Sequence, residues 1–123
     1  MLKHELLTES SVLIVTPQGP LSAEDFQDLA RVVDPYIAEH GKLNGLLIYV
    51  EHFPGWENFA ALLTHLRFVK DHHKKIKRIA AVTDSAVVSM LPKFASHFVD
   101  AEIQHFDYDK KDLALMWVSN GSK

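Results

Sequence analysis

Three short apolar runs alternate with helical patterns along this chain, and this alternation restricts the fold more than any other feature. The runs span Leu46–Val50, Ile79–Val82 and Ile103–Phe106. The Leu46–Val50 run is continuously apolar, which predicts a central strand covered on both faces, and the alternation of the three runs with helical segments predicts a parallel sheet. Each run ends in a turn-rich junction. In open α/β sheets such carboxyl-end loops are where ligands usually bind.

The rest of the chain extends this pattern at both ends. Two β-rich runs, Leu2–Thr8 and Ser11–Thr16, are spaced as in a hairpin. A helix is predicted from Ser22, a good N-cap, to Gly41, a good C-cap. Further helices are predicted over Glu57–Lys70, Ala86–Phe98 and Asp109–Val118. We expect an α/β fold with a mixed, mostly parallel five-stranded sheet, an N-terminal hairpin and four helices mainly on one face, because right-handed crossovers in one direction place their helices together.

Composition narrows the class of protein. A chain of 123 residues with 47% hydrophobic content suits a single domain over residues 1–123. The sequence has no run of about 20 apolar residues, so we expect a cytoplasmic protein, with peripheral membrane association left open. Cysteine is absent, which removes disulfides and thiolate chemistry. A net charge of -3 argues against nucleic acid as a partner.

Five segments, in this order and spacing, resemble successive landmarks of the bacterial SpoIIAA-like family. They are Gly41–Leu43, Phe53–Trp56, Lys77–Asp84, Ala101–Phe106 and Leu113–Trp117. That family is grouped with STAS domains and, by fold, with lipid-binding CRAL-TRIO (Sec14-like) domains. The resemblance implies a four-turn β/α superhelix and no established enzyme activity. No cofactor is predicted.

One departure concerns regulation by phosphorylation. STAS-fold anti-sigma-factor antagonists are switched at a serine in the loop after a central strand, whereas the matching loop here, Glu51–Asn58, has no serine or threonine. The partner switch therefore does not carry over at that position. Thr83 and Ser85 in the next junction are candidate phosphate acceptors. The alternative for Ser85 is that it only caps the following helix.

An aromatic loop and an apolar helix suggest a binding surface. Phe53 and Trp56 flank a Pro-Gly turn, and Pro92 interrupts the apolar helix 86–98. We predict that an apolar ligand or the membrane contacts Phe53, Trp56, Val87, Val88, Met90, Leu91 and Phe94. The alternative is that both rings cover the core edge and that the helix is buried.

Charged and polar side chains add three further candidate features. A basic surface for an anionic membrane is formed by Lys70, Lys74, Lys75, Lys77 and Arg78, unless these cations are merely solvated. The polar side of the pocket is predicted to consist of His52, Thr83, Asp84 and Ser85. His52 and Asp84, with Glu51, are also an alternative acid/base group. No metal site is predicted, because His65 and His72 are too far apart for a helical ligand pair.

Two functions follow from these patterns. The first is a non-catalytic module that binds an apolar small molecule or the membrane surface through loop 53–56 and helix 86–98. The alternative is a STAS-type regulatory protein-interaction domain, with a protein partner or a second copy of the chain, which lacks the phosphoacceptor serine in loop 51–58.

Overall fold

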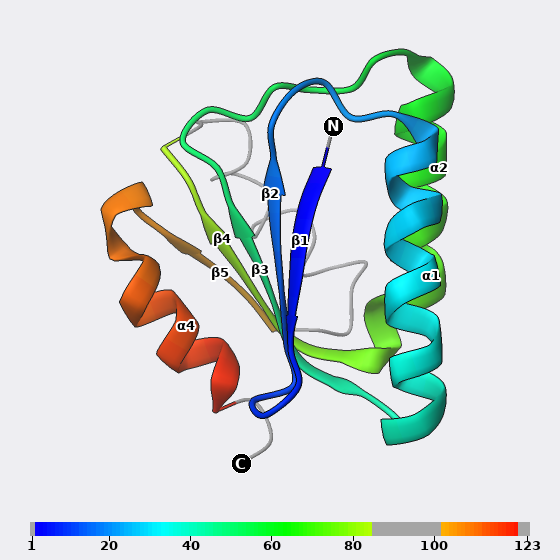
Figure 1. The fold of residues 1–123 in the computed structure, drawn as a ribbon. Helices are drawn as coiled ribbons and strands as arrows, with labels where there is room; N and C mark the ends of the chain where they lie inside the picture. Colours follow the sequence, from blue (N-terminus) through cyan, green and yellow to red (C-terminus); the bar gives the residue numbers. More distant parts are fainter. Residues whose placement is uncertain (1, 85–101, 121–123) are drawn as a thin grey trace.

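The computed structural model describes residues 2–84 and 102–120, and it places a single five-stranded sheet between helices (Figure 1). The strands are β1 (Leu2–Leu7), β2 (Val12–Pro17), β3 (Leu43–Tyr49), β4 (Ile76–Val82) and β5 (Glu102–Phe106). They lie in chain order; β1 is antiparallel to β2 and every other neighbouring pair is parallel. The predicted mixed sheet with an N-terminal hairpin is confirmed.

Three α-helices pack against this sheet within the described ranges. They are α1 (Ala23–His40), α2 (Phe59–His72) and α4 (Lys111–Ser119), with short 3₁₀ turns at His73–Lys75 and Tyr108–Lys110. The helix predicted at 86–98 lies outside the described residues.

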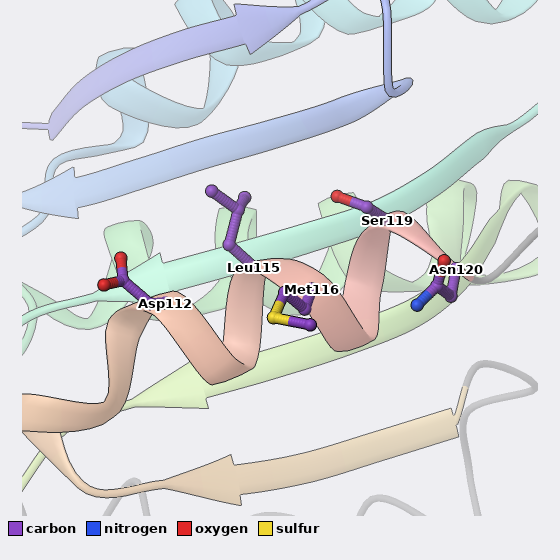
Figure 2. Close-up of a pocket in the computed structure, with 5 residues that line it drawn as sticks. All are labelled: Asp112, Leu115, Met116, Ser119 and Asn120. Carbon is purple, nitrogen blue, oxygen red and sulfur yellow. The ribbon is translucent and has the colours of Figure 1, made fainter.

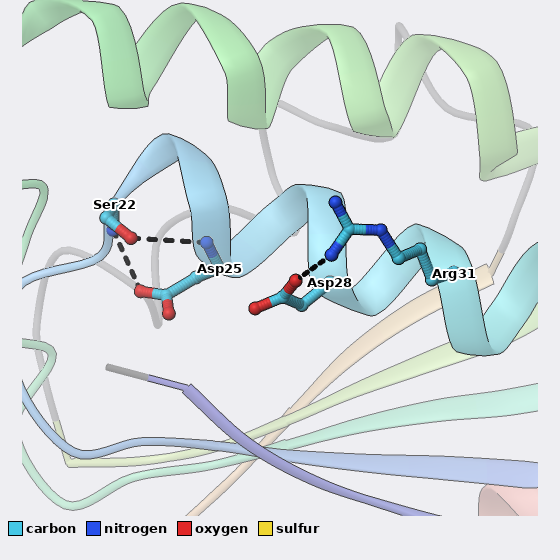
Figure 3. A network of polar contacts seen from close by, with 4 residues as sticks. All are labelled: Ser22, Asp25, Asp28 and Arg31. Carbon is cyan, nitrogen blue, oxygen red and sulfur yellow. Dashed lines mark hydrogen bonds and ion pairs between the residues drawn. The ribbon is translucent and has the colours of Figure 1, made fainter.

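Helix α1 has both of the caps that the sequence predicts. The Ser22 hydroxyl accepts a hydrogen bond from the Asp25 backbone N–H, and the Asp25 carboxylate accepts one from the Ser22 N–H (Figure 3). This reciprocal pair satisfies two N–H groups that the helix leaves unpaired. At the other end Gly41 takes a φ of 86° and donates its N–H to the Ile37 carbonyl. Figure 3 also shows Arg31 paired with Asp28 one turn along the helix.

The helices divide between the two faces of the sheet. In Figure 1, α1 and α2 cover one face and α4 covers the other. The expectation of helices mainly on one face therefore applies to α1 and α2, and α4 departs from it. The reason is topological: α1 and α2 join parallel strands, so crossover handedness fixes their face. Helix α4 follows β5 and leads to no further described strand, so this rule does not constrain it.

A separate apolar cluster lies on each face. On the α4 side the buried residues are Val12, Ile14, Leu47, Ala80, Val82, Ala114 and Val118. On the α1 side they are Leu13, Val15, Leu29, Val33, Leu43 and Ile76. Alternate residues of β2 contribute to opposite clusters, as the two-residue period of a strand requires. The apolar runs of the inner strands are thus explained by burial from both sides.

Two strands begin earlier than their apolar runs suggest. Strand β3 starts at Leu43 and β4 at Ile76, each three residues before the predicted start. The added residues include Asn44 and Arg78, whose polar side chains are satisfied locally. Asn44 donates to the Ser10 carbonyl, and Arg78 donates to the Trp117 carbonyl. Because the strands were predicted from apolar runs, strand positions that carry polar side chains were left out of the prediction.

A glycine in β3 sets the distance between α4 and the sheet. A Cβ placed on Gly45 would overlap the Val118 Cβ and would lie 2.9 Å from the Val118 carbonyl oxygen. Because the second of these atoms belongs to the helix backbone, rotation of a side chain cannot relieve the overlap. Any larger residue at position 45 must therefore push α4 away from β3.

We predict that Gly45→Ala lowers the free energy of unfolding by about 1–3 kcal/mol, the usual cost of overpacking a core. Urea unfolding measures this loss, and the fluorescence of Trp117 on α4 reports displacement of the helix. Gly41→Ala is the control, because nothing lies within 4 Å of its added methyl group and any loss there comes from the positive φ. A Gly45→Ala protein as stable as wild type, with unchanged fluorescence, would contradict the close approach.

Candidate functional site

The loops that follow β3, β4 and β5 are joined into one surface, which we call the carboxyl-end rim (residues 50–58, 83–84 and 107–110). The Val50 N–H donates to the Val82 carbonyl at 3.1 Å, and the Asp84 N–H donates to the Glu51 carbonyl at 3.0 Å. The Thr83 N–H donates to the Phe106 carbonyl, also at 3.0 Å. These backbone bonds continue the sheet ladder past the strand ends. The loops of the rim are therefore held in fixed relative positions.

Thr83 lies at the centre of this bonding and is fully buried. Its hydroxyl donates to the Glu51 carbonyl at 3.0 Å, and its own carbonyl is 2.7 Å from the Nε2 atom of His105. A kinase would reach this hydroxyl only after the strand ends had separated. The structure thus gives Thr83 a role in joining β3 to β4. Ser85, the other candidate phosphate acceptor, lies outside the described residues.

His52 and Asp84 both lie on the rim but have different partners. The Nε2 atom of His52 is 3.6 Å from the Glu51 carboxylate, and its side chain is 78% exposed. The Asp84 carboxylate accepts a hydrogen bond from the Tyr108 N–H at 3.1 Å. Within the described part of the chain, the structure does not join His52 to Asp84. It brings His52 together with Glu51 only, in a solvated setting.

A tyrosine pair was not predicted from the sequence: Tyr49 at the end of β3 and Tyr108 in the rim. The rings of Tyr49 and Tyr108 stack with centroids 4.7 Å apart, and the Lys111 ammonium lies 4.4 Å from the Tyr49 centroid. A hydrogen bond with the Tyr49 side chain raises the pKa of Tyr108 more than any other interaction does. The available signal was the pair of aromatics at the carboxyl ends of β3 and β5, two strands that both flank β4.

The predicted aromatic loop packs against α2. The Phe53 and Trp56 rings meet edge to face at 5.1 Å, and the Trp56 indole N–H donates to the Nδ1 atom of His65 at 3.0 Å. His65 in turn stacks on Phe26 of α1 at 4.5 Å. Both loop rings are partly buried. The hydrogen bond fixes the orientation of the Trp56 ring and leaves part of its surface accessible.

The backbone of this loop is also anchored. The Leu21 N–H donates to the Gly55 carbonyl, and the Glu57 N–H donates to the Leu21 carbonyl. Gly55 has a φ of 83°, a conformation that side chains rarely adopt. The segment that leads into α1 and the loop that leads into α2 therefore hold each other in place. The Pro-Gly turn is a fixed element of the rim.

The predicted basic segment lies at the other end of α2 from the aromatic loop. Loop 53–56 precedes the first turn of this 14-residue helix, whereas Lys70 lies in its last turn and Lys74 and Lys75 follow it. A helix of that length spans about 21 Å. Lys77 and Arg78 begin β4, at the amino-end edge of the parallel strands. The aromatic loop and the basic segment therefore do not form one continuous surface.

Arg78 differs from the lysines of this segment. Its guanidinium donates to the Trp117 carbonyl at 2.8 Å and lies over the Trp117 ring at 4.9 Å. Its Nε atom is 3.7 Å from the Glu102 carboxylate. These contacts connect β4 to α4 and β5. Arg78 is thus a structural residue, while Lys70, Lys74 and Lys75 are exposed.

The rim itself is rich in acidic side chains. Its exposed carboxylates are Glu51, Glu57, Asp84, Asp107 and Asp109, alongside the exposed cation Lys110. The partly buried rings of Phe53 and Trp56 lie in the same surface. The rim therefore combines exposed carboxylates with two fixed aromatic rings.

An open depression of about 500 Å³ lies on the outer side of α4 (Figure 2). Its lining comes from Asp112, Leu115, Met116, Ser119 and Asn120. Met116 is 64% exposed, and Leu113 on the same helix is also exposed. The depression is shallow, and its lining comes from α4 and its C-cap residue Asn120.

Two further classes of site are absent from residues 2–84 and 102–120. There, no group of three or more His, Asp or Glu side chains is arranged to hold a metal ion. In the same ranges, no helix combines the length and apolar character that crossing a membrane requires. Of the apolar helix predicted to contact a ligand, Val87, Val88, Met90, Leu91 and Phe94 lie outside the described residues.

Comparison with known proteins gives a match over most of the chain. A family model described as SpoIIAA-like matches residues 12–119. A solved structure of an uncharacterised protein from Shewanella loihica PV-4, described as having a SpoIIAA-like fold, is similar with a TM-score of 0.75. The two sequences are 22% identical, and the similarity covers 96% of this chain and 92% of the other. A comparison with curated proteins gives no match.

We predict a pH-dependent loss of stability at His65, because burial lowers the pKa of its ring from 6.5 to about 4. Between these values the unfolded chain binds a proton that the folded chain excludes. The contribution is therefore complete above about pH 6.5 and is lost as the pH falls toward 4. The stability difference between wild type and His65→Gln should shrink by about 2 kcal/mol from about pH 7.5 to about pH 5, measured by urea unfolding.

The matched control for this measurement is Thr64→Ala, at the neighbouring position on α2, because a threonine hydroxyl does not ionise in this pH range. Its stability difference from wild type should stay constant over the same pH range. If the His65→Gln difference were equally constant, the ring would not be held neutral by the fold.

Proposed function

Because the chain belongs to the SpoIIAA-like family, we propose that it is a non-catalytic regulatory domain that binds a protein partner through the carboxyl-end rim. The single observation that carries this proposal is the bonding between the loops of the rim. Hydrogen bonds among residues 50–51, 82–84, 106 and 108 hold three loops together before any partner arrives. A surface ordered in this way loses little conformational entropy on binding.

The chemistry of the rim suggests the chemistry of the partner. The exposed carboxylates of Glu51 and Glu57 flank the loop that carries the partly exposed rings of Phe53 and Trp56. Aromatic side chains at the centre of a polar surface commonly carry most of the binding energy, while the surrounding charges determine orientation and partner choice. We therefore expect a partner with a basic surface and an apolar centre.

Catalysis has less support from the same residues. His52 is largely exposed and pairs with Glu51 at 3.6 Å. It therefore lacks the water-excluded setting that is typical of acid/base catalysts. The Asp84 carboxylate accepts a backbone hydrogen bond from the neighbouring loop. Both residues fit better as parts of an interaction surface.

Binding of an apolar ligand or a membrane remains a separate prediction. The described residues support it less than protein binding for two reasons. Trp56 is oriented by its hydrogen bond to His65, and the exposed lysines lie at the far end of α2. Membrane association through one lipid-facing loop normally needs a second anchor beside it.

We predict that reversing two rim charges weakens partner binding without unfolding the protein. The variant is Glu51→Lys with Glu57→Lys, whose side chains are exposed. Partner proteins captured from lysate by delipidated wild type are identified by mass spectrometry, and the affinity of the identified partner is then measured by calorimetry. Loss of two favourable charge pairs should weaken binding at least about tenfold.

The matched control reverses two exposed carboxylates that lie at the other end of the strands from the rim. They are Glu9, in the turn between β1 and β2, and Glu39, in the last turn of α1, and the variant is Glu9→Lys with Glu39→Lys. It has the same net charge as the rim variant, so general electrostatic effects are identical. It should bind the partner as tightly as wild type does. Equal loss in both variants, or binding that requires added lipid, would contradict a rim-directed protein contact.

A further inference from the structure

Strand β1 forms one edge of the described sheet. One of its hydrogen-bonding edges pairs with β2. No described strand pairs with the other edge, and in Figure 1 no described helix covers it. The outer N–H and C=O groups of such a strand are available for pairing with another strand. Proteins usually protect these edges with charged residues, and β1 carries Lys3 and Glu5 exposed.

The two faces of β1 have different chemistry. Leu2, His4 and Leu6 alternate toward the α1 side, where Leu2 and Leu6 pack partly against the apolar cluster. Lys3 and Glu5 point toward the α4 side, since they lie at the intervening positions. The strand therefore has an apolar row with a central histidine, and a second row in which Lys3 and Glu5 carry opposite charges and Leu7 packs against the α4-side cluster.

These two rows are self-complementary in one antiparallel register. When two copies of β1 pair about a two-fold axis through His4, Leu2 lies opposite Leu6 of the second copy. In the same register Lys3 lies opposite Glu5 of the second copy, and the two His4 rings meet on the axis. An axis perpendicular to the sheet keeps apolar positions on one face and charged positions on the other, as directly opposed residues in an antiparallel pair require.

Neighbouring registers lack this match. A shift that centres the axis on Lys3 places two lysines opposite each other and puts Leu2 opposite His4. A shift that centres it on Glu5 opposes two carboxylates and puts Leu6 opposite His4. Like charges directly opposed across strands are destabilising, so the charges select a single register.

From this complementarity we infer that the protein forms a two-fold dimer in which the β1 strands pair and the two five-stranded sheets join into one continuous sheet. The strand that pairs with the outer edge of β1 therefore belongs to a second copy of the same chain, because the residues of β1 are complementary to those of β1 itself in this register. Because the paired β1 strands are antiparallel, the carboxyl-end rims of the two copies face opposite ends of the joined sheet. The dimer would then present two separate rims to partners.

The test is a charge swap in the full chain, measured by sedimentation velocity and native mass spectrometry up to about 100 µM. Wild type is expected to be a dimer. Lys3→Glu brings carboxylates into opposition across the axis, and Glu5→Lys brings ammonium groups into opposition, so each variant alone should dissociate at least about tenfold more readily. An equimolar mixture should recover a heterodimer, because the acidic side chains of one variant then oppose the lysines of the other. The double variant, Lys3→Glu with Glu5→Lys, should also be a dimer.

Amide hydrogen exchange provides a second readout that does not depend on substitutions. Protection of the β1 amides should rise with protein concentration in wild type and should be independent of concentration in Lys3→Glu. A wild type that stays monomeric at the highest concentration, or single variants that remain dimers, would overturn the inference. So would a mixture of the two single variants that contains no heterodimer. Circular dichroism of each variant confirms that the fold is retained, since both positions are exposed.

Discussion

The close packing of α4 on β3 at Gly45 is the contact on which the rest of the structure depends. The strand interiors carry apolar side chains on both faces, and α1 and α2 cover only one of them. Without α4, residues such as Leu47 and Val82 would be exposed to water. The absence of a side chain at Gly45 lets the helix backbone approach until Val118 is buried. Arg78 further stabilises this packing, because its guanidinium donates a hydrogen bond to the Trp117 carbonyl and lies over the Trp117 ring.

The rim follows from the same arrangement. Parallel strands that begin at one edge must end at the other, so the loops after β3, β4 and β5 converge there. Thr83 occupies the middle of this edge, and its buried hydroxyl joins two of the loops. Tyr49 and Lys111 connect the rim to α4 through a ring and a charge. The surface proposed for partner binding is thus an extension of the core, which explains why its loops are ordered.

Histidines that suggest chemistry in the sequence serve packing in the fold. His65 accepts a hydrogen bond from Trp56 and stacks on Phe26. His72 is buried between the helices, where it stacks on Phe68 and its Nε2 atom is 2.6 Å from the Asp34 carboxylate. Together these contacts join α1, α2 and the aromatic loop. A ring with both an apolar body and a polar atom can fill such a position without leaving a buried polar group unpaired.

The sequence by itself determined the order of the described strands and helices, the hairpin, both caps of α1 and the end of the strands at which the rim lies. These features depend on local signals: apolar runs, Ser22, Gly41 and the alternation of element types. The face that α4 covers, the pairing of Trp56 with His65, the stacking of Tyr49 on Tyr108 and the engagement of Arg78 were decided only by the tertiary structure. Each of these joins residues from different elements, and one linear pattern is compatible with several such pairings. Which one forms depends on the space and the partners that the assembled layers provide.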